Sequence, residues 1–112
     1  MKKLKRYVRS DEHLYEMANL TKEDTGLNYI VWISPKTGKE KHWARIKVQV
    51  NMEFIPVTIE DVPRIAVKKN VEIPNFKKLQ KWIVLNKDLL LQYWNSNGEM
   101  SLKLVFKNLK KV

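Results

Sequence analysis

Three strand-like segments joined by turn-length connections constrain the fold of this chain most strongly. Residues 27–34, LNYIVWIS, are β-branched, aromatic and nearly all apolar, which predicts a central strand buried on both faces. Residues 42–50 alternate apolar and polar side chains, and the PKTGKE that precedes them is typical of a hairpin turn. Residues 54–60 form the third segment, in which Pro56 predicts an edge strand or a bulge because proline donates no backbone hydrogen bond.

Helical patterns lie on both sides of this run of strands. Residues 10–20, SDEHLYEMANL, begin with a good N-cap serine and have apolar side chains at helical spacing, so we expect a short helix. Residues 75–95 carry a broad apolar stripe, and Asn86 in its middle predicts a break into two helices. Residues 101–109 alternate again and predict a final strand. The fold class predicted is α+β: a small, mostly antiparallel sheet of about four strands, with a C-terminal helix or helix pair packed on one face.

Length and composition limit the organisation and the chemistry of the chain. Its 112 residues predict a single domain, 1–112, in which residues 1–9 form either a basic N-terminal arm or an edge strand. The absence of cysteine excludes thiol chemistry, and with two histidines we expect no metal site and no cofactor. No apolar run approaches the length of a membrane span or of a signal-peptide core. We therefore expect a soluble, cytoplasmic protein without membrane contact.

The charge is the one unusual feature of the composition. Twenty-two lysines and arginines against twelve acidic residues give a net charge of +10, and lysine outnumbers arginine by eighteen to four. Such a field favours polyanions, whether nucleic acid, an anionic membrane surface or an acidic protein, and lysine favours contacts to phosphate over the reading of bases. A lysine-rich proteome would give the same charge without any polyanionic ligand, and this alternative stays open.

The segment 36–47, which we call the basic hairpin, concentrates this charge. Glu40 is its one acidic residue. Trp43 has the same strand parity as Arg45, so an aromatic ring would lie among cations, an arrangement that stacks on a base and holds the neighbouring phosphates. The alternative is that these side chains form the solvated face of an ordinary strand. The nucleic-acid contacts predicted from the hairpin are Lys36, Lys39, Lys41, Trp43, Arg45 and Lys47.

The same segment allows a catalytic interpretation. A metal-free ribonuclease needs a group that accepts a proton near neutral pH and cations that stabilise the developing phosphorane charge, and His42, Arg45 and Lys47 offer these groups. On a regular strand, however, His42 points to the face opposite Arg45. It would join the basic face only if the strand begins after it or contains a bulge.

The segments EMANL, DTGL, VWISPKTG and KHWARIKV, followed by LQKWIVLNKDLLLQYW, carry a family resemblance. Over most of residues 10–95 the chain resembles a group of small uncharacterised bacterial proteins. More loosely, it is similar to a domain-of-unknown-function family whose genes often lie in two-gene, toxin–antitoxin-like pairs. The carrying residues are Asn19, Leu20, Thr25, Gly26, Leu27, Trp32, Ile33, Ser34, His42, Arg45, Lys47, Val48, Trp82, Asn86, Leu90 and Trp94. The chain departs from the group in its lysine-rich termini and its longer VKKNVEIPNF link. The resemblance implies a small bacterial or mobile-element accessory protein and makes His42 and Arg45 the first residues to test.

Three functional hypotheses follow from the residues. The first is a non-enzymatic nucleic-acid-binding or regulatory module that uses the basic hairpin. The second is a metal-free ribonuclease or toxin-like component of a two-gene pair. The third is a protein-interaction module whose basic face binds an acidic partner. The sequence leaves open whether DNA or RNA is bound, whether the protein is an enzyme, and its oligomeric state.

Overall fold

The computed structural model describes residues 7–9, 16–36 and 42–112 of the chain. It confirms the predicted α+β class, although the antiparallel sheet has five strands, which lie in the order of the chain. The strands are β1 (Tyr7–Arg9), β2 (Glu16–Leu20), β3 (Ile30–Ile33), β4 (Arg45–Val50) and β5 (Glu53–Thr58). The predicted edge strand at the N-terminus corresponds to β1, and residues 1–6 lie outside the described part.

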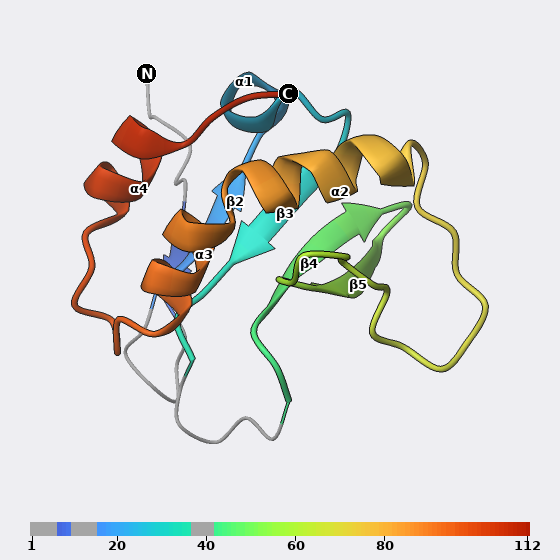
Figure 1. Cartoon of the computed structure of the whole chain (residues 1–112), viewed down its shortest axis with the longest axis horizontal. Coiled ribbons are helices and arrows are strands. Elements are labelled where there is room, and N and C mark those ends of the chain that lie inside the picture. The colour runs from blue at the N-terminus through green and yellow to red at the C-terminus, as the bar shows by residue number, and fades with distance from the viewer. Residues whose placement is uncertain (1–6, 10–15, 37–41) are drawn as a thin grey trace.

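The helices follow the sheet, apart from one short helix between β2 and β3. They are α1 (Lys22–Thr25), α2 (Phe76–Leu85), α3 (Lys87–Trp94) and α4 (Leu102–Asn108). Figure 1 shows α2 and α3 one after the other across one face of the sheet, with α4 beside α3. Asn86 separates α2 from α3, so the predicted helix pair and its break are confirmed.

The core lies between this face of the sheet and the helices. Alternate side chains of four strands are buried there: Ala18, Leu20, Val31, Ile33, Ile46, Val48, Ile55 and Val57. Leu79, Trp82, Ile83 and Leu90 from α2 and α3 pack against them in the same cluster. Each fully buried aliphatic or aromatic side chain stabilises the fold by about 1.5–3 kcal/mol through its removal from water.

The central position predicted for the strand in 27–34 is confirmed, because β3 is the middle strand of the five. Its predicted burial on both faces is wrong. Val31 and Ile33 are buried, whereas Ile30 and Trp32 on the opposite face are only half-buried. The face of the sheet that carries Trp32 is therefore less covered than an all-apolar strand suggests.

The expected helix over 10–20 is wrong for the residues that the structure describes. Glu16–Leu20 form β2, which pairs antiparallel with β1 on one side and β3 on the other. Ala18 and Leu20 are buried at the spacing of two that a strand requires. Backbone pairing on both sides overrides the helical spacing of the apolar residues, and residues 10–15 lie outside the described part.

The expected strand over 101–109 is wrong as well, because this segment forms α4. The Ser101 side chain caps the helix by accepting a hydrogen bond from the backbone N–H two residues later, at 3.1 Å. Val105 is buried and Phe106 packs against the core, while Leu104 is largely exposed. The apolar residues that pack inward therefore follow the helical period, and the alternation along the sequence is coincidental.

Pro56 lies in an edge strand, as predicted, because β5 is the last strand of the sheet. Its carbonyl accepts a hydrogen bond from the N–H of Ala66 at 2.8 Å, and Val57 forms an isolated bridge with Ile65. The predicted hairpin is also confirmed, since β3 and β4 pair antiparallel. In the part of the chain that the structure describes, no helix has the length and apolar character needed to cross a membrane.

Candidate nucleic-acid interface

The face of the sheet opposite α2 and α3, which we call the open face, carries the candidate site. Strand alternation sends there the residues that are not in the core: Met17 and Asn19 from β2, Trp32 from β3, Arg45, Lys47 and Gln49 from β4, and Phe54 and Pro56 from β5. All of these side chains are half-buried or exposed. In Figure 1 the helices lie in front of the sheet, so this face is turned away from the viewer.

The register of the strands places aromatic and cationic side chains next to one another. Trp32 lies directly opposite Lys47, and Gln49 lies opposite Phe54. The rings of Trp32 and Phe54 meet edge to face, with centroids 6.2 Å apart and an interplanar angle of 64°. The Trp32 indole N–H also donates a hydrogen bond to Gln49 Oε1 at 3.0 Å. Strands β3, β4 and β5 thus hold an aromatic pair on this face, between the central strand and the β5 edge, with a lysine beside it.

A pocket of about 220 Å³ opens at one end of this face, and we call it the Arg45 pocket. It is lined by Met17, Trp32, Ser34, His42, Arg45, Lys47, Pro56 and Trp94. The structure therefore brings together His42, Arg45 and Lys47, the three residues of the catalytic hypothesis. The reason is that β4 begins at Arg45, so strand alternation does not fix the direction of the His42 side chain.

The His42 ring is held by two contacts in this pocket. It lies 5.9 Å from the ring of Trp94, centroid to centroid, and its Nδ1 lies 2.9 Å from the carbonyl oxygen of Trp43. A carbonyl oxygen only accepts, so Nδ1 carries the hydrogen of this bond. In the neutral ring the lone pair is then on Nε2, which is the nitrogen able to accept a proton.

The two cations of the pocket are unpaired among the described residues. Neither Arg45 nor Lys47 has a carboxylate within ion-pair distance, whereas Arg64, Lys69 and Lys87 each do. The Nε atom of Arg45 is buried and finds no hydrogen-bond acceptor there. A buried donor without an acceptor costs about 1–3 kcal/mol, so an acceptor atom of a bound ligand would stabilise the site.

A second hollow of about 450 Å³ adjoins the Arg45 pocket, and the two share His42 and Trp94. Lys36, Trp43, Ala44, Leu91 and Asn95 complete its lining. The Lys36 N–H donates to the Trp94 carbonyl at 2.8 Å, which fixes the strand end against α3. Trp43 is 76% exposed. It lies in this hollow and not in the Arg45 pocket, although its parity suggested the face of Arg45.

The predicted contact residues are therefore divided between two adjoining hollows. Arg45 and Lys47 lie on the open face, while Lys36 and Trp43 lie around its end. Lys39 and Lys41 lie outside the described residues. Alternation along 42–50 predicts that Gln49 shares the face of Arg45 and Lys47, whereas no sequence pattern assigned Trp32, Phe54 or Trp94 to the site. The available signal was the spacing of two between Ile30, Trp32 and Ser34, which was hidden because residues 27–34 are almost all apolar.

Within residues 7–9, 16–36 and 42–112, no three histidine, aspartate or glutamate side chains converge on a point where a metal ion could bind. Comparison with known proteins adds no relative: no family model, no curated protein and no solved structure matches this chain.

Proposed function

We propose that the chain is a non-enzymatic nucleic-acid-binding module that holds a single strand across the open face of its sheet. The observation that carries this proposal is the position of Trp32 and Phe54 beside the unpaired cations Arg45 and Lys47 on one accessible surface. Aromatic rings stack on unpaired bases and cations track the phosphates, so the two kinds of residue serve the two parts of each nucleotide. The net charge of +10 adds long-range attraction for a polyanion such as nucleic acid. The cytoplasmic location that the sequence predicts is part of the same proposal.

The shape of the face favours a single strand over a duplex. Duplex DNA is read by an element that enters a groove, usually a helix or a two-stranded ribbon. Helices α2, α3 and α4 lie on the other face (Figure 1), and the aromatic pair reaches from the central strand β3, which carries Trp32, to the edge strand β5, which carries Phe54. Paired bases could not stack on rings in that position, whereas splayed bases could. Lys36 and Trp43 would extend the binding path past the end of β4 toward α3.

A salt titration of oligonucleotide binding tests this proposal. A fluorescent oligouridylate and a duplex DNA are titrated with the protein from about 50 to about 200 mM salt, and the logarithm of affinity is plotted against that of salt. We expect tighter binding of the single strand. The Arg45→Ala/Lys47→Ala variant should weaken that binding and make the slope shallower by roughly 1.4, because each lost phosphate contact on a single strand contributes about 0.7.

A matched variant separates a defined site from general attraction to a basic protein. Lys103→Ala/Lys107→Ala removes the same charge from two exposed positions on α4. This helix lies on the helical side of the sheet and not on the open face (Figure 1). It should leave the slope close to that of the wild type. If both double variants lose affinity equally, or if the wild type binds independently of salt, the proposed site is wrong.

A second candidate function is supported by the geometry of His42. This residue shares the Arg45 pocket with Arg45 and Lys47, and its Nε2 carries the lone pair. In a metal-free ribonuclease, Nε2 would accept the proton of a 2′-hydroxyl, whose oxygen then attacks the neighbouring phosphorus. The bond from phosphorus to the 5′-oxygen breaks, and that oxygen leaves as a hydroxyl after taking a proton from water. Arg45 and Lys47 would stabilise the phosphorane charge. This candidate corresponds to a toxin-like component of a two-gene pair.

Incubation of the same RNA with the protein in chelator distinguishes the two candidates. The nuclease predicts products ending in a 2′,3′-cyclic phosphate, lost in His42→Ala, and growth inhibition on expression of the wild type but not of that variant. The binding module predicts intact RNA and near-normal binding by His42→Ala. Cleavage that persists in His42→Ala would rule out His42 as the base and overturn this mechanism.

A further inference from the structure

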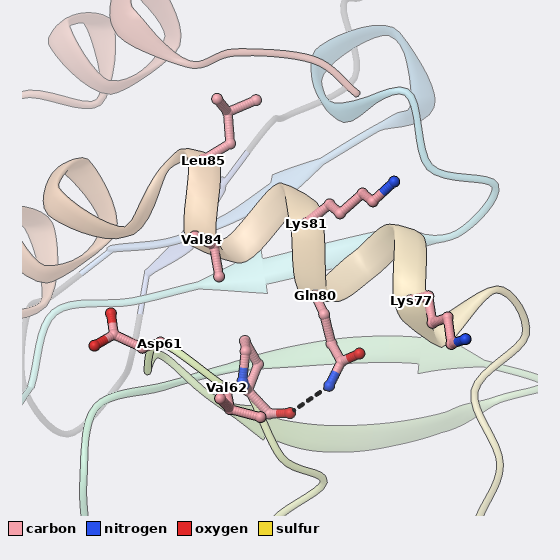
Figure 2. A pocket seen from close by; sticks show the side chains of 8 residues that line it. Asp61, Val62, Lys77, Gln80, Lys81, Val84 and Leu85 are labelled. Atoms are coloured by element: carbon pink, nitrogen blue, oxygen red, sulfur yellow. Dashed lines mark hydrogen bonds between the residues drawn. The ribbon is translucent and has the colours of Figure 1, made fainter.

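A groove lies on the helical side of the molecule, between α2 and the segment 61–63 that follows β5 (Figure 2). It has a volume of about 570 Å³, the largest of the hollows described above. Its lining is Asp61, Val62, Pro63, Lys77, Gln80, Lys81, Val84 and Leu85. None of these residues belongs to the open face, and we call this hollow the α2 groove.

The floor of the α2 groove is apolar and accessible. Val62 is 71% exposed, Val84 46% and Leu85 45%. Figure 2 shows Val84 and Gln80 extending from α2 toward the segment that carries Val62. Single exposed aliphatic side chains are common on protein surfaces, whereas these three line the same hollow and offer a ligand adjoining apolar contacts.

Both walls of the groove are fixed before any partner arrives. Gln80 Nε2 donates a hydrogen bond to the Pro63 carbonyl at 2.9 Å, which ties α2 to the opposite wall. Lys87 Nζ lies 2.6 Å from Asp61 Oδ1, which ties the start of α3 to the same segment. A groove whose walls are already fixed loses little conformational entropy when a ligand binds. More of the free energy gained by covering its apolar floor therefore appears as affinity.

The charge around the groove is positive. Lys77 and Lys81 are one helical turn apart on α2, both are exposed, and neither pairs with a carboxylate among the described residues. Asp61, the single acidic residue of the lining, is already neutralised by Lys87. A ligand therefore meets an apolar floor beside two unpaired cations.

We propose that the α2 groove binds an amphipathic, acidic segment of a partner protein. Aliphatic side chains of that segment would cover Val62, Val84 and Leu85, and carboxylates spaced one helical turn apart would pair with Lys77 and Lys81. A second copy of this chain does not fit, because a symmetric pairing of the groove would bring the same lysines together. The proposal is independent of nucleic-acid binding, since the two surfaces lie on different sides of the sheet.

Selection from a phage-displayed library of random peptides of about 16 residues, roughly four helical turns, tests this proposal with the full-length protein as bait. Enriched peptides should combine aliphatic residues at helical spacing with aspartate or glutamate. Val84→Ser/Leu85→Ser should weaken binding of the best synthetic peptide by about tenfold or more, because the variant loses two aliphatic side chains whose removal from water drives binding. Both residues are partly exposed, so circular dichroism should show an unchanged fold.

Charge reversals complete the test. Lys77→Glu/Lys81→Glu should reduce peptide affinity strongly, whereas Lys103→Glu/Lys107→Glu, the same change at the same spacing on α4, should not. Arg45→Ala/Lys47→Ala should leave peptide binding intact, so the outcome is separate from that of the nucleic-acid proposal. No enrichment, equal losses in the two charge-reversed variants, or binding that survives Val84→Ser/Leu85→Ser would overturn the proposal. So would preferential binding of the groove to vesicles of anionic phospholipid over the selected peptide.

Discussion

Trp32 on β3 and Gln49 on β4 are joined on the open face by a hydrogen bond of 3.0 Å from the indole N–H to the side-chain oxygen. The edge-to-face contact with Phe54 on β5 holds the same indole from a further strand. The ring therefore has a fixed orientation in the free protein. A base that stacks on it does not first have to order the side chain, which favours binding.

Trp32 should accordingly contribute most to single-strand affinity. Trp32→Ala should weaken binding of the oligouridylate by about 1–3 kcal/mol, or roughly 5- to 150-fold, the range for loss of one base-stacking ring. Trp32→Phe keeps an aromatic surface and should lose much less. The measurement is fluorescence anisotropy at fixed salt. Met52→Ala, a change at the exposed β4–β5 turn, is the control and should bind like the wild type. Unchanged affinity in Trp32→Ala would remove the aromatic pair from the site.

The parts of the fold that could be predicted from the sequence are those that short segments determine. Turn residues and alternation identify the β3–β4 hairpin, the missing N–H of Pro56 places it in an edge strand, and Asn86 interrupts the apolar stripe of the helix pair. The helical period of about 3.6 residues and the strand period of two cannot be distinguished over segments as short as 16–20 and 101–109. Their state depends on β1 and β3 in one case and on the Ser101 cap and the packing of α4 in the other.

The candidate site, like the fold, could be predicted only where a short segment determines the positions of its residues. Alternation within 42–50 already places Arg45 and Lys47 on one face. Whether His42 joins them depends on where β4 begins, which is a property of the sheet and not of the segment. Trp32 and Phe54 belong to strands that are not adjacent, and β4 between them sets their distance. No local pattern contains that information.

Asn86 should be the most sensitive polar position in the fold. It is buried, and its Nδ2 donates to the carbonyls of Trp82 and Lys110 while its Oδ1 accepts from the Lys110 N–H at 2.8 Å. Asn86→Ala removes the side-chain partner of the Lys110 N–H and carbonyl, whereas the Trp82 carbonyl still accepts from the Asn86 backbone N–H, and the free energy of unfolding should fall by about 1–3 kcal/mol. Asn108→Ala removes a similar bond to a carbonyl four residues earlier, but at an exposed site, and should cost about 0.5 kcal/mol or less. Urea unfolding measures both; equal effects would contradict a structural role for Asn86.

Gly26 is required for two separate reasons. Its φ of +82° lies in the left-handed region, and a side chain there would collide with the carbonyl oxygen of Val112, whose N–H donates to the Thr25 carbonyl at 2.9 Å. Figure 1 shows the C-terminal end of the chain against α1. Gly98→Ala, at a φ of +78°, should lose about 1–2 kcal/mol from backbone strain. Gly26→Ala should lose more in thermal or urea unfolding, and an equal loss would show that the Val112 contact contributes nothing.

Tyr29 should make stability depend on pH in the alkaline range. Burial raises the pKa of its phenol to about 12, and its hydroxyl donates to the Pro74 carbonyl at 3.0 Å. An unfolded phenol has a pKa of about 10, so between pH of about 10 and about 12 the unfolded chain releases this proton while the folded chain keeps it. The contribution of Tyr29 is therefore complete below a pH of about 10 and is lost as pH rises through about 12.

At a pH of about 9, Tyr29→Phe should be less stable than the wild type by about 1 kcal/mol, the value of a typical hydrogen bond. The difference between the two proteins in urea unfolding should shrink as pH rises, and the variant should also lose a late step in tyrosinate absorbance. A difference that stays constant over this range would show that the Tyr29 phenol has the same pKa in the folded and unfolded chain.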